Sequence, residues 1–108
     1  MDYNEIEANA VVELRRGTMT LAVLCLLGEP RYGYSILQLL EEKHVQIDAG
    51  TLYPLLRRLE AQGVLESRWD TEQSRPRKYY VLNENGLRLR EALKNEWRRL
   101  SGEISEII

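Results

Sequence analysis

The segment from Gly50 to Leu59 limits the possible folds more than any other part of the sequence, because as a helix it has two opposite faces. With about 100° between successive residues, its leucines fall on one side and make an apolar face. These leucines are Leu52, Leu55, Leu56 and Leu59. The opposite face carries Gly50, Tyr53, Pro54 and Arg57. The segment is therefore predicted to be a helix that buries its leucines and leaves a basic, aromatic face at the surface.

Proline and glycine set the predicted ends of this helix. Because proline disrupts hydrogen bonding in a helix interior, Pro54 favours a start near Gly50 or Thr51 rather than at Asp48. The helix is predicted to stop at Gly63, a residue type that commonly follows the last turn.

Two further helices are predicted before this segment, at about residues 6–27 and 32–43. The stretch from Arg15 to Thr18 is a candidate break in the first, with Thr18 capping a buried second part that ends at Gly28. After the amphipathic helix, residues 64–69 and 77–82 favour strands and flank a turn at 71–76. They predict a β-hairpin with an exposed basic tip.

The last segment, capped by Asn83 or Asn85, has apolar residues at successive spacings of 4, 4, 3, 4 and 3. This spacing is typical of a coiled-coil-like stripe and predicts a helix that pairs with a second copy of the chain. The predicted dimer-interface residues are Leu89, Leu93, Trp97, Leu100, Ile104 and Ile107.

The net charge of −2 is unusual for a nucleic-acid-binding domain, but the charge is unevenly distributed. Residues 1–50 hold four Lys or Arg against eight Asp or Glu, and residues 84–108 hold five of each. Residues 51–83 hold six against four, so the only positive third contains the amphipathic helix and the hairpin. Local charge of this kind decides what binds within a Debye length.

The residue inventory argues against an enzyme. One histidine and one cysteine leave no nucleophile paired with a base, no metal-ligand set and no glycine-rich phosphate loop. We therefore expect no catalytic residues, no cofactor and no bound metal. Cys25 lies in an apolar run and is predicted to be a core residue.

A membrane location is not expected either. The longest apolar run, from Leu21 to Leu27, is much shorter than the roughly 20 residues that a spanning helix needs. The first ten residues are acidic and polar, unlike a secretory signal, so the chain is expected in the cytoplasm.

Three helices followed by a hairpin are the parts of a winged helix-turn-helix, in which the third helix enters the major groove of DNA. The predicted fold class is mainly α with a small β-hairpin: a winged helix-turn-helix plus a C-terminal dimerisation helix. Residues 1–83 form the DNA-binding region with its N-terminal helix, and residues 84–108 form the dimerisation helix, within one compact domain.

Four stretches also resemble the signature of the PadR family. They are Tyr32-Gly33-Tyr34, the run from Gly50 to Glu60, Gly63-Val64-Leu65, and Arg75-Pro76-Arg77-Lys78-Tyr79-Tyr80. The resemblance covers about residues 14–100 and points to the short branch with a single C-terminal helix. It implies a bacterial repressor that binds a pseudo-palindromic DNA operator as a homodimer and is released by a small aromatic or hydrophobic effector. Ser74 departs from the family, which often has glycine there.

The predicted DNA-contacting residues lie on the amphipathic helix and on the hairpin. They are Thr51, Tyr53, Pro54, Arg57, Arg58, Arg75, Arg77 and Lys78. Arg57 and Arg58 would contact either base edges or phosphates, and Thr51 would bind a phosphate or simply cap its own helix. The alternative for the cations is an ordinary solvated surface.

By resemblance, Trp97 and Leu93 would line an effector pocket, the alternative for Trp97 being packing in the dimer alone. The alternative function is a winged helix that binds a protein partner and not DNA. Such a module would not need the cations of the helix and the hairpin.

Overall fold

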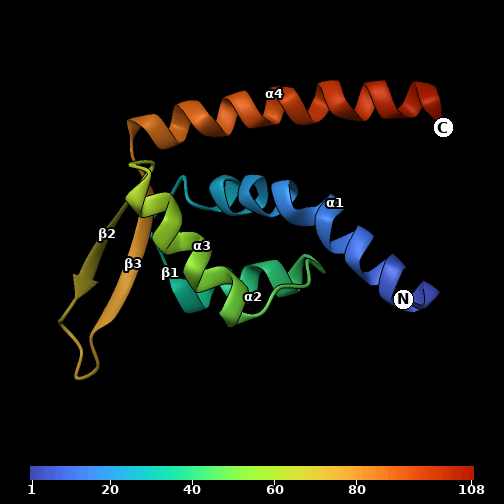
Figure 1. Ribbon diagram of the computed structural model, residues 1–108. Helices are drawn as coiled ribbons and strands as arrows, with labels where there is room; N and C mark the ends of the chain where they lie inside the picture. Colours follow the sequence, from blue (N-terminus) through green and yellow to red (C-terminus); the bar gives the residue numbers. More distant parts are fainter.

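Helix α1 runs without a break from Tyr3 to Leu26 in the computed structural model, which describes residues 1–108 (Figure 1). The side chain of Asp2 caps its start by accepting a hydrogen bond from the Glu5 amide at 2.9 Å. The predicted break is wrong, because the Thr18 hydroxyl instead donates to the Arg15 carbonyl inside the helix at 2.9 Å. Gly17 costs only about 1 kcal/mol relative to alanine, which a 24-residue helix tolerates.

The helix-turn-helix follows as strand β1 (Arg31–Tyr32), helix α2 (Gly33–Glu42) and helix α3 (Ala49–Ala61). Helix α3 starts slightly earlier than predicted because Asp48 is its N-cap and accepts a hydrogen bond from the Thr51 amide at 2.8 Å. Pro54 is accommodated inside this helix. Gly63 has a φ of +81°, which explains why glycine follows the last turn.

The predicted hairpin is confirmed as β2 (Leu65–Asp70) and β3 (Arg77–Leu82), which pair antiparallel. Strand β1 adds to the outer side of β3, giving the order β1-β3-β2. Two residues are too few to show a strand periodicity, so β1 was not predicted. We call residues 65–82, which project from the helical body in Figure 1, the wing.

The strand register divides the wing side chains between its two faces, because directly opposite residues share a face. Ser67 lies opposite Tyr80, and Trp69 opposite Lys78, on the face toward α3. Asp70 lies opposite Arg77 on the other face. Neighbouring cations of the wing therefore point in opposite directions.

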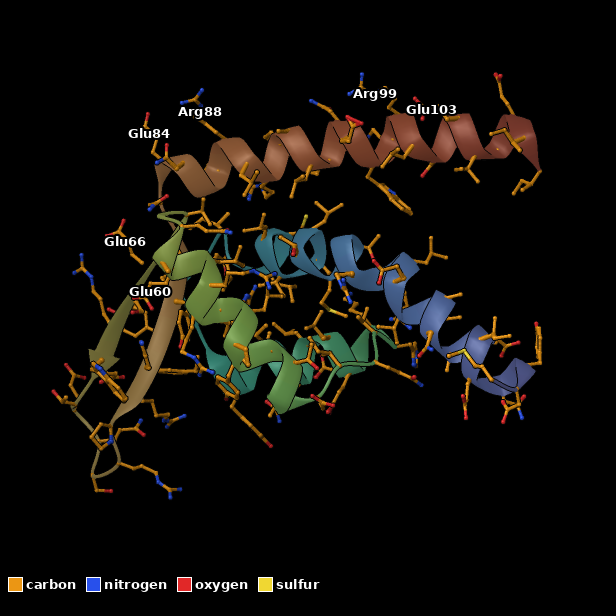
Figure 2. All side chains as sticks on the ribbon, viewed as in Figure 1. Glu60, Glu66, Glu84, Arg88, Arg99 and Glu103 are labelled. Carbon is orange, nitrogen blue, oxygen red and sulfur yellow. The ribbon has the colours of Figure 1, made fainter.

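Helix α4 (Glu84–Ile107) begins at Asn83, whose side chain accepts a hydrogen bond from the Gly86 amide at 2.9 Å. It lies alongside the C-terminal half of α1, while the N-terminal half of α1 diverges from it (Figure 1). The labelled charged residues of α4 in Figure 2 point away from α1. These are Glu84, Arg88, Arg99 and Glu103.

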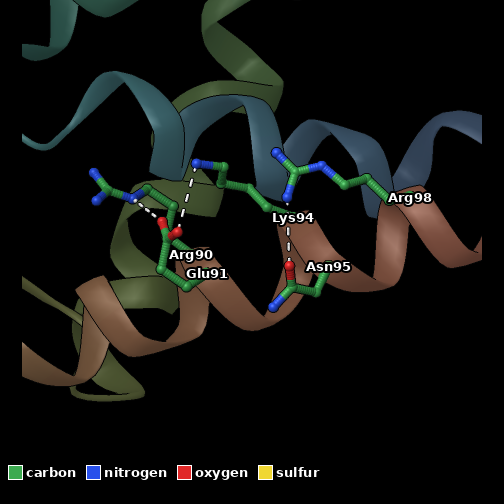
Figure 3. Close-up of polar contacts among 5 residues, drawn as sticks. All are labelled: Arg90, Glu91, Lys94, Asn95 and Arg98. Carbon is green, nitrogen blue, oxygen red and sulfur yellow. Dashed lines mark hydrogen bonds and ion pairs between the residues drawn. The ribbon is translucent and has the colours of Figure 1, made fainter.

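A row of charged residues flanks the apolar stripe of α4. Glu91 pairs with Arg90 at 3.0 Å and with Lys94 at 3.5 Å, and Arg98 donates to Asn95 at 3.4 Å (Figure 3). The hydrogen bond from Arg90 and the charge of Lys94 lower the pKa of Glu91. These charged side chains are therefore paired with one another along α4.

One hydrophobic core joins α1, α2, α3 and the sheet, and the four leucines of α3 are all buried in it as predicted. Helix α4 contributes no large fully buried side chain.

Cys25 is exposed, so its prediction as a core residue is wrong. It shares a helical face with Leu14 and Leu21, whereas Val23 and Leu24 face the core. None of the helices is long and apolar enough to cross a membrane.

Candidate nucleic-acid interface

The outer face of α3 carries four exposed residues opposite the buried leucines: Thr51, Pro54, Arg57 and Arg58. Both arginine side chains are free of hydrogen bonds and ion pairs within the chain. A guanidinium that no carboxylate neutralises keeps its donors for an external acceptor, either a base edge or a phosphate. The buried stripe fixes the rotation of α3 and thereby holds these arginines toward solvent.

Tyr53 was expected on the outer face, but its side chain is half-buried and packs against the core. It covers Gly33 at the start of α2, where an added Cβ would lie only 2.5 Å from the Tyr53 ring. Gly33 therefore permits the close approach of α2 to α3. Tyr53 is accordingly both a packing residue and the partly exposed edge of the α3 surface.

The three wing cations predicted to contact DNA have different surroundings. Arg75, at the tip, is exposed and has no partner within the chain. The Arg77 guanidinium lies over the Tyr32 ring, 4.9 Å from its centroid, and donates a hydrogen bond to Gln73. Lys78 lies on the opposite face of the hairpin, toward α3. Of these three cations, Arg75 is thus the one most available to a phosphate.

The end of the wing strands nearest the tip is tied to the helix-turn-helix through Tyr32. Its hydroxyl donates to Asp70 Oδ2 at 2.6 Å, and its ring meets that of Tyr79 edge-on with centroids 6.2 Å apart. The hydrogen bond from Tyr32, followed by one from the Glu72 amide, lowers the pKa of Asp70, while the same bond to Asp70 raises the pKa of Tyr32. These contacts hold the wing at a fixed angle to α2.

Lys78 has its partners on the face of the wing that lies toward α3. Its Nζ lies 3.5 Å from Glu60 Oε1 on α3 and 5.5 Å from the centroid of the Tyr80 ring. Ser67 donates a hydrogen bond to the second oxygen of Glu60. Tyr80 is 4% exposed, and burial raises its pKa. Glu60 therefore joins the end of α3 to both strands of the wing.

Sequence reasoning missed several residues of this surface. Trp69 is 63% exposed on the α3 side of the wing, and its alternation with Leu65 and Ser67 is the signal that could have placed it there. Tyr32 and Asp70 are 38 positions apart, and no local pattern connects them.

A second region, an apolar cleft of about 640 Å³, lies between α1 and α4. Its apolar walls are Leu14, Leu21, Leu93, Trp97, Leu100 and Ile104. Trp97 is half-exposed here, whereas Leu89 and Leu93 are partly buried against the core of their own chain. Ile107 is 79% exposed near the end of α4. The six predicted interface residues thus share one helix stripe, which is partly buried at Leu89 and Leu93 and exposed from Trp97 onward.

Comparison with known proteins gives consistent matches. The model of the transcriptional regulator PadR-like family matches residues 21–94. The crystal structure of a PadR family transcriptional regulator from Eggerthella lenta is similar at 44% identity and a TM-score of 0.88, covering 97% of this chain and 94% of that one. A PadR family transcription regulator from Clostridium difficile is similar at 30% identity and a TM-score of 0.75, covering 82% of this chain and 95% of that one.

An uncharacterized protein from Lysinibacillus sphaericus is 34% identical over 101 residues, which are 89% of each chain. The matched region of the family model contains α2, α3, the wing and the first part of α4. It therefore includes every residue of the candidate nucleic-acid interface.

Proposed function

The chain belongs to the PadR-like family of transcriptional regulators, and from this premise we propose that it binds double-stranded operator DNA through α3 and the wing. The observation that carries the proposal is the pair of unpartnered, exposed arginines on α3, Arg57 and Arg58, beside the basic wing tip. A helix presented in this way fits the major groove, while cations on a flanking hairpin fit the phosphate backbone. The family is one of regulators, which agrees with the expectation that the chain is not an enzyme.

The proposed contacts divide by position. Arg57 and Arg58 reach base edges or phosphates in the groove, Thr51 and Pro54 approach the backbone at the start of α3, and Arg75 contacts a flanking phosphate. Tyr53 and Arg77 also belong to the proposed interface, and each packs within the chain as well. Tyr53 packs against Gly33, and Arg77 lies over the Tyr32 ring. Lys78 belongs to the same interface, although Glu60 already pairs with it.

The chain acts as a homodimer in this proposal. Leu100 and Ile104 are 46% and 53% exposed, and together with Trp97 they give the α1–α4 cleft an apolar wall that a single chain leaves open to water. Burial of such side chains contributes about 1.5 to 3 kcal/mol each, which favours pairing with a second copy. A two-fold dimer presents two copies of α3 to successive major grooves and so matches a pseudo-palindromic operator.

The regulatory part of the proposal is a repressor that a small aromatic or hydrophobic effector releases from DNA. The apolar cleft with Trp97 at its wall is the feature that supports an effector of this class. An effector acts only by binding one arrangement of the two subunits better than another, here by changing the separation of the two α3 helices.

A DNA-binding titration tests the proposal. Purified protein is titrated against a duplex from upstream of its own gene and against a scrambled duplex of the same composition, with and without phenolic and polyaromatic compounds. We expect much tighter binding to the upstream duplex, and weaker binding when an effector is present. Equal, weak binding to both duplexes would contradict operator recognition.

Charge reversal separates DNA binding from binding to a protein partner. A variant with Arg57→Glu and Arg58→Glu should lose DNA affinity while keeping its melting temperature, because both side chains are exposed and unpartnered. Unchanged DNA binding in this variant would show that the α3 face serves another partner.

A further inference from the structure

Glu60 is the only carboxylate that forms an ion pair with a cation of the α3 and wing surface. Its two oxygens have different partners: Oε1 lies 3.5 Å from Lys78 Nζ, and Oε2 accepts the Ser67 hydroxyl hydrogen bond. Both charged side chains are about one-third exposed, so the pair lies at the surface and not in the core. The Ser67 hydroxyl holds the Glu60 carboxylate in position, and this carboxylate in turn holds the Lys78 ammonium in position.

The pair lies within the proposed DNA-contacting surface. Glu60 follows Arg57 by three residues on α3, so the two side chains are neighbours on the surface of this helix. The buried Tyr80 ring lies on the wing face toward α3. The Lys78 ammonium also lies over the face of this ring. Arg57 is exposed and unpaired, whereas Lys78 is neutralised within the chain by Glu60.

We propose that Glu60 is a specificity-determining residue, whose carboxylate withholds Lys78 from the phosphates of DNA that α3 does not fit. This inference rests on the proposed DNA-binding function. Binding to DNA of arbitrary sequence depends almost entirely on lysines and arginines that neutralise phosphates and release their counterions. A lysine that already has a fixed carboxylate partner contributes little to such binding, and the carboxylate itself repels the phosphates.

Operator DNA changes the competition for Lys78. When α3 is seated in its groove, the adjacent phosphates are held at fixed positions relative to the wing. Exposed ion pairs are weak, so a phosphate held at contact distance displaces the carboxylate from Lys78. Lys78 then adds a backbone contact in the operator complex alone.

The test is the salt dependence of binding by Glu60→Gln, measured on the upstream duplex and on the scrambled duplex. The amide oxygen of Gln still accepts the Ser67 hydrogen bond, but the charge that holds Lys78 is gone. On scrambled DNA the slope of log affinity against log salt should steepen by about one unit. The affinity advantage of the variant over the wild type should therefore shrink about threefold between roughly 50 and 200 mM salt. On the upstream duplex the slope should stay unchanged.

Two variants serve as controls. Glu66→Gln removes the same charge one residue from Ser67 but on the far side of the hairpin, pointing away from α3, and should alter neither slope (Figure 2). Adding Lys78→Ala to Glu60→Gln should abolish the gain on scrambled DNA. A purely structural role for Glu60 would lower the melting temperature without steepening the slope.

The outcomes separate this inference from the proposed function. If the wild type prefers the upstream duplex, but Glu60→Gln leaves the scrambled slope unchanged or shifts both slopes equally, the role of Glu60 is wrong and operator recognition stands. If the wild type has no preference for the upstream duplex, operator recognition itself fails.

Discussion

At the scale of single residues, Arg75 and Arg77 differ in what they already contact. Arg75 has no partner, so Arg75→Ala should leave the melting temperature unchanged and reduce the salt slope of DNA binding by about one unit. Arg77 is stacked on Tyr32 and bonded to Gln73, so Arg77→Ala should also lower the melting temperature. Binding titrations at several salt concentrations and thermal melts measure both effects. An unaltered slope in Arg75→Ala would remove the wing tip from the DNA interface.

The hydrogen bond between Tyr32 and Asp70 predicts a pH dependence. The folded pKa of Asp70 is lowered by Tyr32, so its contribution is present above the unfolded value of about 3.9 and is lost as the pH falls through the folded value. The pKa of Tyr32 is raised by Asp70, so its contribution is present below about 10 and is lost as the pH rises through the folded value.

Tyr32→Phe removes this hydrogen bond and should lower the melting temperature between about pH 4 and pH 10. The difference from the wild type should shrink below and above that window. Tyr34→Phe, in which the altered side chain is exposed and has no hydrogen-bond partner, is the matched control. A difference that is constant across the whole pH range would contradict the assignment.

At the scale of whole elements, α3 depends on its leucine stripe. Leu56 is fully buried at the centre of that stripe, so Leu56→Ala should destabilise the fold by about 2 to 5 kcal/mol through lost burial and a residual cavity. Arg58→Ala, on the opposite face of the same helix, should have almost no effect on stability. Chemical denaturation measures both, and similar losses in the two variants would mean that α3 is rotated from its described position.

The elements that could be predicted from sequence are those with a clear local period. The two faces of α3, the alternating strands of the wing and the apolar stripe of α4 are each visible within a few turns or residues. The wrong predictions lie where tertiary contacts decide. Gly17 and Thr18 are compatible with a break or with a helix, and the outward rotation of Cys25 depends on which side of α1 meets the core.

The candidate site was predictable to the same extent. The position of Arg57 follows from the rotation of α3, which the leucines fix. The burial of Tyr53 against Gly33 depends on how α2 and α3 cross. The pairing of Lys78 with Glu60 depends on where the end of α3 meets the wing. Sequence spacing alone predicts neither of these two contacts.

For the molecule as a whole, recognition of a two-fold operator requires two chains. The variant Leu100→Glu with Ile104→Glu should be monomeric, because it places charges in the apolar wall of the α1–α4 cleft. These positions are preferable to Leu93, which also packs against the core of its own chain. The variant should keep its fold but lose operator binding, since a single α3 helix reads only one half-site. Sedimentation measures the association state.

Glu103→Gln on the outer side of α4 is the matched control and should remain dimeric with full DNA affinity (Figure 2). A wild-type chain that sediments as a monomer at micromolar concentration and binds the upstream duplex fully would contradict the dimer.

In the proposed complex, two copies of α3 enter successive major grooves while the wings contact the flanking backbone. Hydroxyl-radical footprinting of the wild-type protein on the upstream duplex maps these contacts. We expect two protected half-sites on one face of the DNA, with centres about 34 to 36 Å apart and related by a two-fold axis. A single protected patch, or uniform weak protection along the duplex, would contradict it.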